Sequence, residues 1–364
     1  MRRALGALQT WPYTFAVALS LVVGTTAIVA SQKLGIGLKD PEGFLGPAYV
    51  RLPLIGLLFF AAGVIPQALM RTGVWPVNRL FKLPQAVRGI IRDDWTWSRV
   101  GNIATGLLAF YVCYVSYRNL KSYLPEIRTK DGHQILYDSD MLRFDHWLMF
   151  GHNPGPLLHD LLGTNVAAQV LAASYVFYLP LIPLTLGALL VWNRDVSLGA
   201  WYATALSLNW ILGTVSYYMI PTLGPGFAQP SMFADLPENP ASTLQNALFR
   251  GGSQFKEDPS GDHIYGIAGF ASLHVSVVVT ACLFFERTGQ KLVVRICAWA
   301  FLCTTILATV YFGWHYIADD VAGALIGWLA VSIGAWVTGN RGRRRRKNAE
   351  PLTEPEAAEA TVGA

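Results

Sequence analysis

Residues 293–338 read VVRICAWAFLCTTILATVYFGWHYIADDVAGALIGWLAVSIGAWVT, and this stretch decides the fold. Its two halves are apolar runs of about 20 residues, long enough for each to cross a hydrocarbon core of roughly 30 Å as a helix. His315 lies in the short junction between the two runs, and Asp319 follows near the start of the second run. The stretch therefore predicts two membrane-crossing helices with ionisable side chains where they meet.

The same apolar character extends over the whole chain of 364 residues. Hydrophobic residues make up 53% of the sequence and charged residues only 14%, whereas a soluble domain has about 25% charged residues. We therefore expect an all-α, polytopic membrane protein with about eight transmembrane helices. The expected spans are residues 12–31, 50–70, 99–118, 166–192, 198–220, 268–286, 293–313 and 316–338.

The distribution of basic residues predicts the orientation, because cytoplasmic loops carry an excess of Lys and Arg. With the N-terminus inside, 18 of the 28 Lys and Arg residues fall in cytoplasmic segments. We therefore predict a multi-pass protein of the cell membrane with both termini in the cytoplasm. The net charge is +5, but the basic residues are scattered over short loops, so nucleic acid is not expected as a partner.

Two of the predicted outside loops, 119–165 and 221–267, are long, and long loops are often functional. Residues 144–150 mix apolar and polar side chains, which favours a helix lying in the membrane interface that shapes a lipid entrance. The second loop contains several prolines and acids and is predicted to be irregular and extramembranous. The basic run 341–347 begins a tail that is predicted to be disordered near anionic lipid.

Three residues at the ends of predicted helices are candidates for catalysis. Ionisable side chains in a membrane are energetically costly, so their presence indicates a function. On a helix, the spacing of four between His315 and Asp319 places both on one face, where a carboxylate orients an imidazole. His274 begins the sixth predicted helix after Ser272, and there it can protonate a leaving oxygen. The alternative for the first pair is a structural polar contact between helices.

The predicted topology brings three clusters to one membrane face. The start of the sixth helix, the junction of the last two helices and the end of the third all emerge outside. Near the end of the third helix stand Arg118 and Lys121, cations suited to phosphate oxygens. They can also be read as ordinary interface anchors. The convergence of three polar clusters at one membrane face nevertheless favours a functional site over a chance arrangement.

The motifs resemble those of the type 2 phosphatidic acid phosphatase superfamily. Its second motif is similar to Ala271-Ser272-Leu273-His274, and its third is similar to Ala308-Thr309, five residues, His315, three residues, Asp319. Leucine at the third place of the second motif is similar to the branch that includes inositol phosphorylceramide synthases. The tyrosine-rich stretch 217–225, which ends in Pro-Thr and further prolines, resembles that branch as well.

The resemblance implies three regions in the chain, and the sequence departs from the family's motifs in two places. Residues 98–338 would form a six-helix phosphatase-like catalytic domain, 1–97 two added helices with a cytoplasmic loop, and 339–364 the basic tail. Thr309 stands where the family has the arginine of its third motif, and the first motif is not intact. Two phosphate-binding cations are therefore missing from their usual places.

The resemblance implies roles for four residues. His315 would attack a phosphoester, Asp319 would orient it, His274 would serve the leaving group and Ser272 would donate to a phosphate oxygen. No metal or cofactor is required by these residues. The expected activity is that of a lipid phosphatase or phosphotransferase working at the outer membrane surface.

The nearest substitutes for the missing cations are Arg118, Lys121 and, from the second outside loop, Arg250. The expected substrate is a lipid or polyprenyl phosphate, with an alcohol such as inositol or a sugar as the possible acceptor. A catalytically degenerate lipid transporter or lipid-binding membrane protein is the alternative, because the missing arginine weakens the grip on phosphate.

Overall fold

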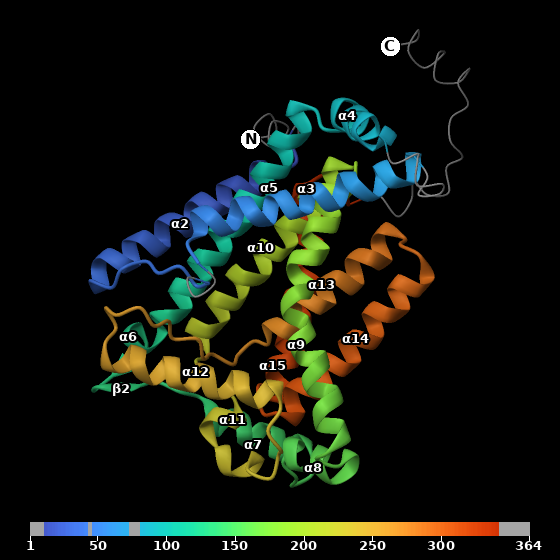
Figure 1. Ribbon diagram of the computed structural model, residues 1–364. Coiled ribbons are helices and arrows are strands. Elements are labelled where there is room, and N and C mark those ends of the chain that lie inside the picture. The colour runs from blue at the N-terminus through green and yellow to red at the C-terminus, as the bar shows by residue number, and fades with distance from the viewer. Residues whose placement is uncertain (1–10, 43–45, 73–80, 342–364) are drawn as a thin grey trace.

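The computed structural model describes residues 11–42, 46–72 and 81–341, and this part of the chain is almost wholly helical (Figure 1). Six of the described helices are long and apolar enough to cross a membrane. They are α2 (Thr14–Leu34), α3 (Ala48–Thr72), α5 (Trp97–Ser122), α9 (Val166–Gly187) continued by η3 (Ala188–Trp192), α14 (Leu292–Tyr311) and α15 (Ile317–Val337). The predicted all-α, polytopic class is confirmed.

The two other expected spans are helices in the interior of the bundle. They form α10 (Val196–Met219) and α13 (Leu273–Thr288), which fall outside the length and hydropathy limits that the six helices meet. Helix α10 packs against α5, α13 and α15, and most of both helices is buried. Their side chains therefore meet other helices rather than lipid, so they need less apolar sequence than a lipid-facing span.

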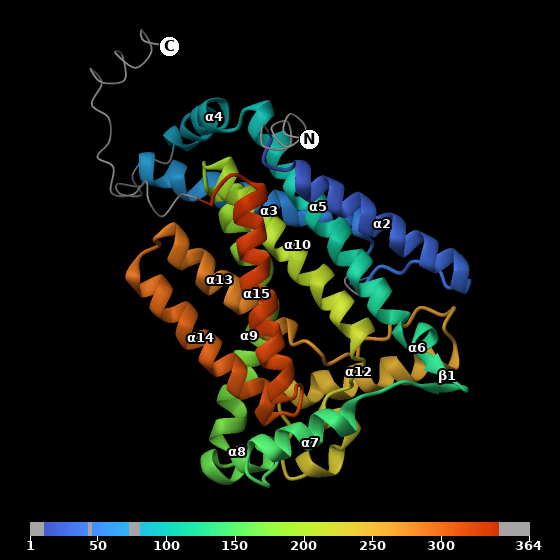
Figure 2. The ribbon, with the colours of Figure 1, turned by 180° about the vertical axis from the view of Figure 1, so that it is seen from behind.

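The remaining elements are short and join the long helices. They are α4 (Leu83–Asp94), α6 (Leu124–Ile127), β1 (Thr129–Lys130), β2 (His133–Gln134), α7 (Asp138–Leu148), α8 (Pro154–Leu162), α11 (Pro225–Ala228), η4 (Pro230–Phe233) and α12 (Pro240–Glu257). Helices α7, α8 and α12 lie at one end of the bundle, and α4 lies at the other (Figures 1 and 2). The predicted interfacial helix at 144–150 falls largely in α7.

The expectation of an irregular second outside loop was wrong. Helix α12 occupies 18 residues of it, and its start carries clear signals. The side chain of Asn239 accepts hydrogen bonds from the N–H groups of Ala241 and Ser242, and Pro240 takes the first helical position, where its missing N–H costs nothing. The basic run 341–347 lies outside the described residues, except for its first residue.

Two glycines allow α15 to approach α13 closely. A Cβ atom at Gly323 would lie 2.2 Å from the carbonyl oxygen of Ser272, and one at Gly327 would lie 2.4 Å from that of Ser276. The spacing of four residues is that of small residues at helix contacts in membranes. This contact places the start of α13 beside the start of α15.

A buried polar cluster ties three of the interior helices together. Asn209 on α10 donates to the hydroxyl of Thr280 on α13 at 2.9 Å and accepts a hydrogen bond from Ser276. Thr280 in turn contacts the carbonyl oxygen of Gly327 on α15 at 3.2 Å. Because unpaired polar groups are costly inside a bundle, these bonds fix the register of α10, α13 and α15.

Candidate active site

A tight turn before α15 positions His315. The backbone N–H groups of Trp314 and His315 both donate to the carbonyl oxygen of Thr309, at 2.8 and 3.3 Å. Gly313 adopts a φ of 67°, a left-handed conformation that glycine takes without strain. The helix itself begins after Tyr316, its N-cap residue. His315 thus lies in the junction between the expected spans 293–313 and 316–338, and the turn, rather than a shared helix face, brings it close to Asp319.

His315 and Asp319 form a close buried pair. The Nδ1 atom of His315 lies 3.4 Å from Oδ2 of Asp319, which is an ion-pair distance but long for a hydrogen bond. The same carboxylate oxygen accepts a hydrogen bond from the N–H of Tyr316 at 3.0 Å. Side-chain exposure is 6% for the histidine and zero for the aspartate. With Nδ1 facing the carboxylate, Nε2 is the ring nitrogen left for chemistry.

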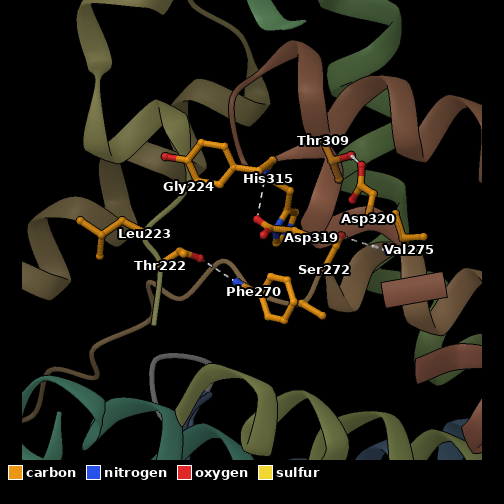
Figure 3. A network of polar contacts seen from close by, with 12 residues as sticks. Thr222, Leu223, Gly224, Phe270, Ser272, Val275, Thr309, His315, Asp319 and Asp320 are labelled. Atoms are coloured by element: carbon orange, nitrogen blue, oxygen red, sulfur yellow. Dashed lines mark hydrogen bonds and ion pairs between the residues drawn. The ribbon is translucent and has the colours of Figure 1, made fainter. Parts of the chain in front are cut away.

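A second carboxylate, Asp320, completes this corner of the site (Figure 3). The hydroxyl of Thr309 donates to Oδ2 of Asp320 at 2.8 Å, and Oδ1 of Asp320 is buried without a hydrogen-bond partner among the described residues. Ser272 is fully buried, and its hydroxyl caps α13 by accepting from the N–H of Val275 at 3.4 Å. Thr309 stands where the third motif of the resembled family has arginine, and here its hydroxyl binds Asp320.

His274 lies in the first turn of α13 between two tyrosine rings. Its ring centroid is 4.5 Å from that of Tyr175 and 4.3 Å from that of Tyr178. The centroids of His274 and His315 are 5.8 Å apart. The hydroxyl of Tyr178 donates to the carbonyl oxygen of Leu273 at 3.2 Å, which steadies the start of the helix. The two imidazoles, 41 residues apart in the sequence, therefore lie close together at the starts of α13 and α15.

The Pro-Thr pair after α10 holds the chain that leads into α13. The carbonyl oxygen of Thr222 accepts from the N–H of Gly269 at 2.8 Å, and its hydroxyl oxygen accepts from the N–H of Phe270 at 2.8 Å (Figure 3). The next residue but one, Gly224, is packed against the carbonyl of Trp314, where a Cβ would lie at 2.3 Å. These contacts join the turns before α13 and before α15.

Of the predicted cations, Lys121 lies nearest to the histidines. It is 8% exposed, its Nζ stands 5.0 Å from the ring centroid of Tyr217, and it interacts electrostatically with both His274 and His315. Arg118, one turn earlier on α5, interacts electrostatically with Lys121. Within the described ranges, no carboxylate lies within 4.0 Å of either cation.

The third predicted cation, Arg250, is exposed on α12. Among the residues that the structure describes, no contact joins it to His274, His315 or Asp319. In the same part of the chain, no three His, Cys, Asp or Glu side chains are grouped so that they could hold a metal ion. The described site is therefore built from two imidazoles, buried carboxylates and two cations.

Burial sets the protonation state of His315. Loss of solvent lowers its pKa to about 4, with Asp320 opposing this effect and Lys121 adding to it. The imidazole is consequently neutral at physiological pH, and a neutral imidazole has the free electron pair that a nucleophile needs.

Helix α7 contributes two buried aspartates that the sequence did not single out. Asp138 accepts hydrogen bonds at 3.0 Å from the N–H groups of Leu223 and Gly224 and from the hydroxyl of Tyr316. Asp145 accepts from the N–H of Ile317 at 3.1 Å. The spacing of seven residues, two helical turns, was the available signal that both face inward.

The carboxyl group of Asp145 is buried, and burial disfavours its charged form. Burial raises its pKa to about 6, nearby Asp319 acts in the same direction, and the N–H of Ile317 opposes the shift. Its Oδ1 atom is buried without a hydrogen-bond partner. Asp138 also has a pKa raised by burial. Helix α7 is therefore fastened to the turn that carries His315 through two carboxyl groups whose pKa values are raised by burial.

The fold and the site define a membrane-embedded helical bundle with a histidine and aspartate pair at the start of its last described helix. The sequence profile of the PAP2 superfamily matches residues 139–333, more than half of the chain, and the chain belongs to that superfamily. No curated protein and no solved structure matches it significantly. Membership supports a lipid phosphatase or phosphotransferase type of function; the matched region starts after α5, which carries Arg118 and Lys121.

Proposed function

We propose that this protein cleaves or transfers a lipid-linked phosphate through a phosphohistidine formed on His315. The observation that carries the proposal is the buried pair of His315 and Asp319, 3.4 Å apart, with the ring of His274 at 5.8 Å. A carboxylate at Nδ1 stabilises the imidazolium that forms when Nε2 bonds to phosphorus. A second imidazole across the gap is suited to the leaving oxygen.

The proposed reaction has two balanced steps. In the first, Nε2 of His315 bonds to phosphorus, the bond from phosphorus to the leaving oxygen breaks, and that oxygen takes a proton from His274. In the second, the oxygen of water or of an alcohol bonds to phosphorus and loses its proton to His274, while the N–P bond breaks. Helix α7, through Asp138 and Asp145, positions the turn that holds the nucleophile.

We assign the grip on phosphate to Lys121 and Arg118. Lys121 is buried and neighbouring Arg118 is half-buried, and among the described residues neither cation has a carboxylate in ion-pair range. Holding two such cations close together is costly, and a bound anion relieves that cost. Arginine and lysine are the side chains that hold phosphate oxygens. In this chain Thr309 stands where the family motif has arginine. Cations from α5, which lies outside the matched family region, would take over the binding of phosphate.

We propose transfer to an alcohol such as inositol or a sugar as the second step. The supporting observations are the Ser272-Leu273-His274 form of the second motif and the tyrosine-rich end of α10. Tyr217 lies under Lys121, and the hydroxyl of Tyr218 donates to the carbonyl oxygen of Leu120 at 2.6 Å, so this end of α10 is joined to the cation-bearing end of α5.

Leaving-group dependence tests the two histidine roles. His315→Ala should abolish turnover of every phosphoester. His274→Ala should slow alkyl phosphates by about 10²- to 10⁴-fold but aryl phosphates much less, because a phenolate leaves without a proton. His133→Ala, at an exposed histidine of β2, is the matched control and should leave turnover unchanged. Equal losses for both substrates in His274→Ala would contradict its role as the acid.

Product analysis separates transfer from hydrolysis. The purified protein is given a lipid phosphodiester donor with and without inositol. Transfer predicts a new inositol-containing phosphodiester that depends on His315, whereas hydrolysis predicts a phosphomonoester and a free alcohol even without added inositol.

A lipid transporter that kept the fold and lost the chemistry is the second candidate. The observation that favours it is Thr309, whose hydroxyl is engaged by Asp320 where the family has a phosphate-binding arginine. Movement of lipid across reconstituted vesicles that survives both His274→Ala and His315→Ala would support this candidate over the enzyme.

A further inference from the structure

An open apolar groove of about 930 Å³ runs beside α7. Its walls include Leu142 and Trp147 on α7, Phe150 in the following turn and Met232 on η4. Trp147 is 72% exposed and Phe150 is 94% exposed. Exposed aromatic groups of this kind are typical of the membrane interface and of surfaces that bind an apolar partner.

The groove adjoins the candidate active site. Leu142, Asn153 and Met232 line the groove and also a narrow crevice that ends at His315 and Tyr316. The crevice holds only about 10 Å³, close to the space of one water molecule. One of its wall residues is Met232, and a methionine side chain readily changes shape to admit an occupant. An occupant that extends inward from the groove therefore arrives at His315.

The apolar lining of the groove indicates which class of ligand it can bind. Its lining is mostly apolar, and the cation at its rim, Arg143, is already paired with Asp140. A sugar or an inositol would find few free hydrogen-bonding groups there, whereas a hydrocarbon chain would lose unfavourable contact with water. Helix α7, which lines the groove, lies with α8 at the end of the bundle where α15 begins (Figure 2).

We propose that this groove binds the hydrocarbon chain of the lipid whose phosphate reacts at His315. The inference rests on the proposed function and adds where the donor lipid lies. In this arrangement the chain rests along Leu142, Trp147 and Met232, and the phosphate passes through the crevice to the histidine. The side of α5 is left for the alcohol acceptor.

Chain-length selectivity tests the groove. The ratio of kcat/KM for dioleoyl phosphatidic acid to that for dihexanoyl phosphatidic acid is measured in detergent for each variant. Trp147→Ala should lower this ratio about tenfold, because the longer chain loses more apolar contact. Met232→Trp, on a different element, should lower it by filling the groove. Trp97→Ala, which removes a 91% exposed tryptophan on α5, is the matched control with an unchanged ratio.

The outcomes separate the groove from the reaction. A wild-type protein that turns over both lipids, with the same ratio in Trp147→Ala and Met232→Trp, overturns the groove proposal alone. An unchanged ratio accompanied by an altered oligomeric state would assign the groove to a second copy of the chain and would also overturn it. Turnover of neither lipid by the wild-type protein would contradict the proposed function together with this inference.

Discussion

Asp319 has two partners at once. Its Oδ2 atom accepts the N–H of Tyr316, which caps the start of α15, and it lies 3.4 Å from Nδ1 of His315. A single carboxylate thus couples the position of the helix to the orientation of the imidazole. An amide at this place could still accept the N–H of Tyr316, but it would bring no negative charge to the histidine.

We therefore expect Asp319→Asn to separate catalysis from folding. Turnover should fall by about 10²- to 10⁴-fold, because the imidazolium on His315 loses its counter-charge. The melting temperature should change less than in Asp319→Ala, which also loses the helix cap. Turnover close to that of the wild-type protein in Asp319→Asn would show that the charge is not needed.

The pKa of Asp145 predicts how stability depends on pH. Its folded-state pKa of about 6 lies above the usual value of 3.8, so its contribution to stability is present below pH 3.8 and lost as the pH rises through 6. The loss at pH 7.5 is about 3 kcal/mol. Asp145→Asn imitates the neutral acid, so it should raise the melting temperature relative to wild type more at pH 7.5 than at pH 4.

Thermal unfolding in detergent at the two pH values measures this difference. Asp140→Asn is the matched control, at an aspartate of the same helix whose side chain is 46% exposed. An equal effect of Asp145→Asn at both pH values would be inconsistent with a carboxyl group that ionises at a cost in the folded protein.

At the scale of elements, the site depends on how closely α13 and α15 approach. Gly323 faces the carbonyl oxygen of Ser272, and the N–H of Ser272 donates to the carbonyl oxygen of Asp319 at 2.9 Å. The helix that begins with His274 and the helix that follows His315 are thereby joined at their first turns. Any side chain at Gly323 must push them apart.

Gly323→Ala should consequently abolish activity and lower the melting temperature, because its Cβ would lie 2.2 Å from the backbone oxygen of Ser272. Gly101→Ala on α5 is the matched control, since no atom lies within 4 Å of its added Cβ. The control should keep its activity and gain up to about 1 kcal/mol from better helix propensity. Activity and thermal unfolding are measured on both; a fully active Gly323→Ala protein would contradict the close contact.

The helices and the local motif could be predicted from sequence, whereas the partners of the motif could not. Apolar runs announce membrane helices directly, and His315 and Asp319 lie four residues apart, so local geometry suffices. Asp138 and Asp145 meet the same turn from more than 170 residues away, which only tertiary packing determines. Helix α12 was missed because its prolines were read as loop residues, although Pro240 starts the helix.

At the scale of the whole molecule, the described helices place α4 at one end of the bundle and α7, α8 and the start of α15 at the other (Figures 1 and 2). From the excess of basic residues in the predicted inside segments, we propose that the α4 end faces the cytoplasm. By this assignment, the candidate active site lies on the extracytoplasmic side.

Cysteine labelling tests that orientation. In a background without the four native cysteines, His133→Cys in β2 should react with a membrane-impermeant maleimide added to intact cells. Arg88→Cys on α4 should react only after the membrane is opened; both positions are exposed. The reverse pattern would place the site on the cytoplasmic side and contradict the charge distribution.

The covalent intermediate gives the most direct test of the central claim. The purified protein is mixed with a lipid phosphate or phosphodiester donor, quenched under alkaline conditions that preserve phosphohistidine, and sequenced by mass spectrometry. We expect a phosphoryl-containing group on His315 of the wild-type protein that accumulates when the acceptor is left out, and none in His315→Ala. Turnover by His315→Ala, or the group on another residue, would contradict it.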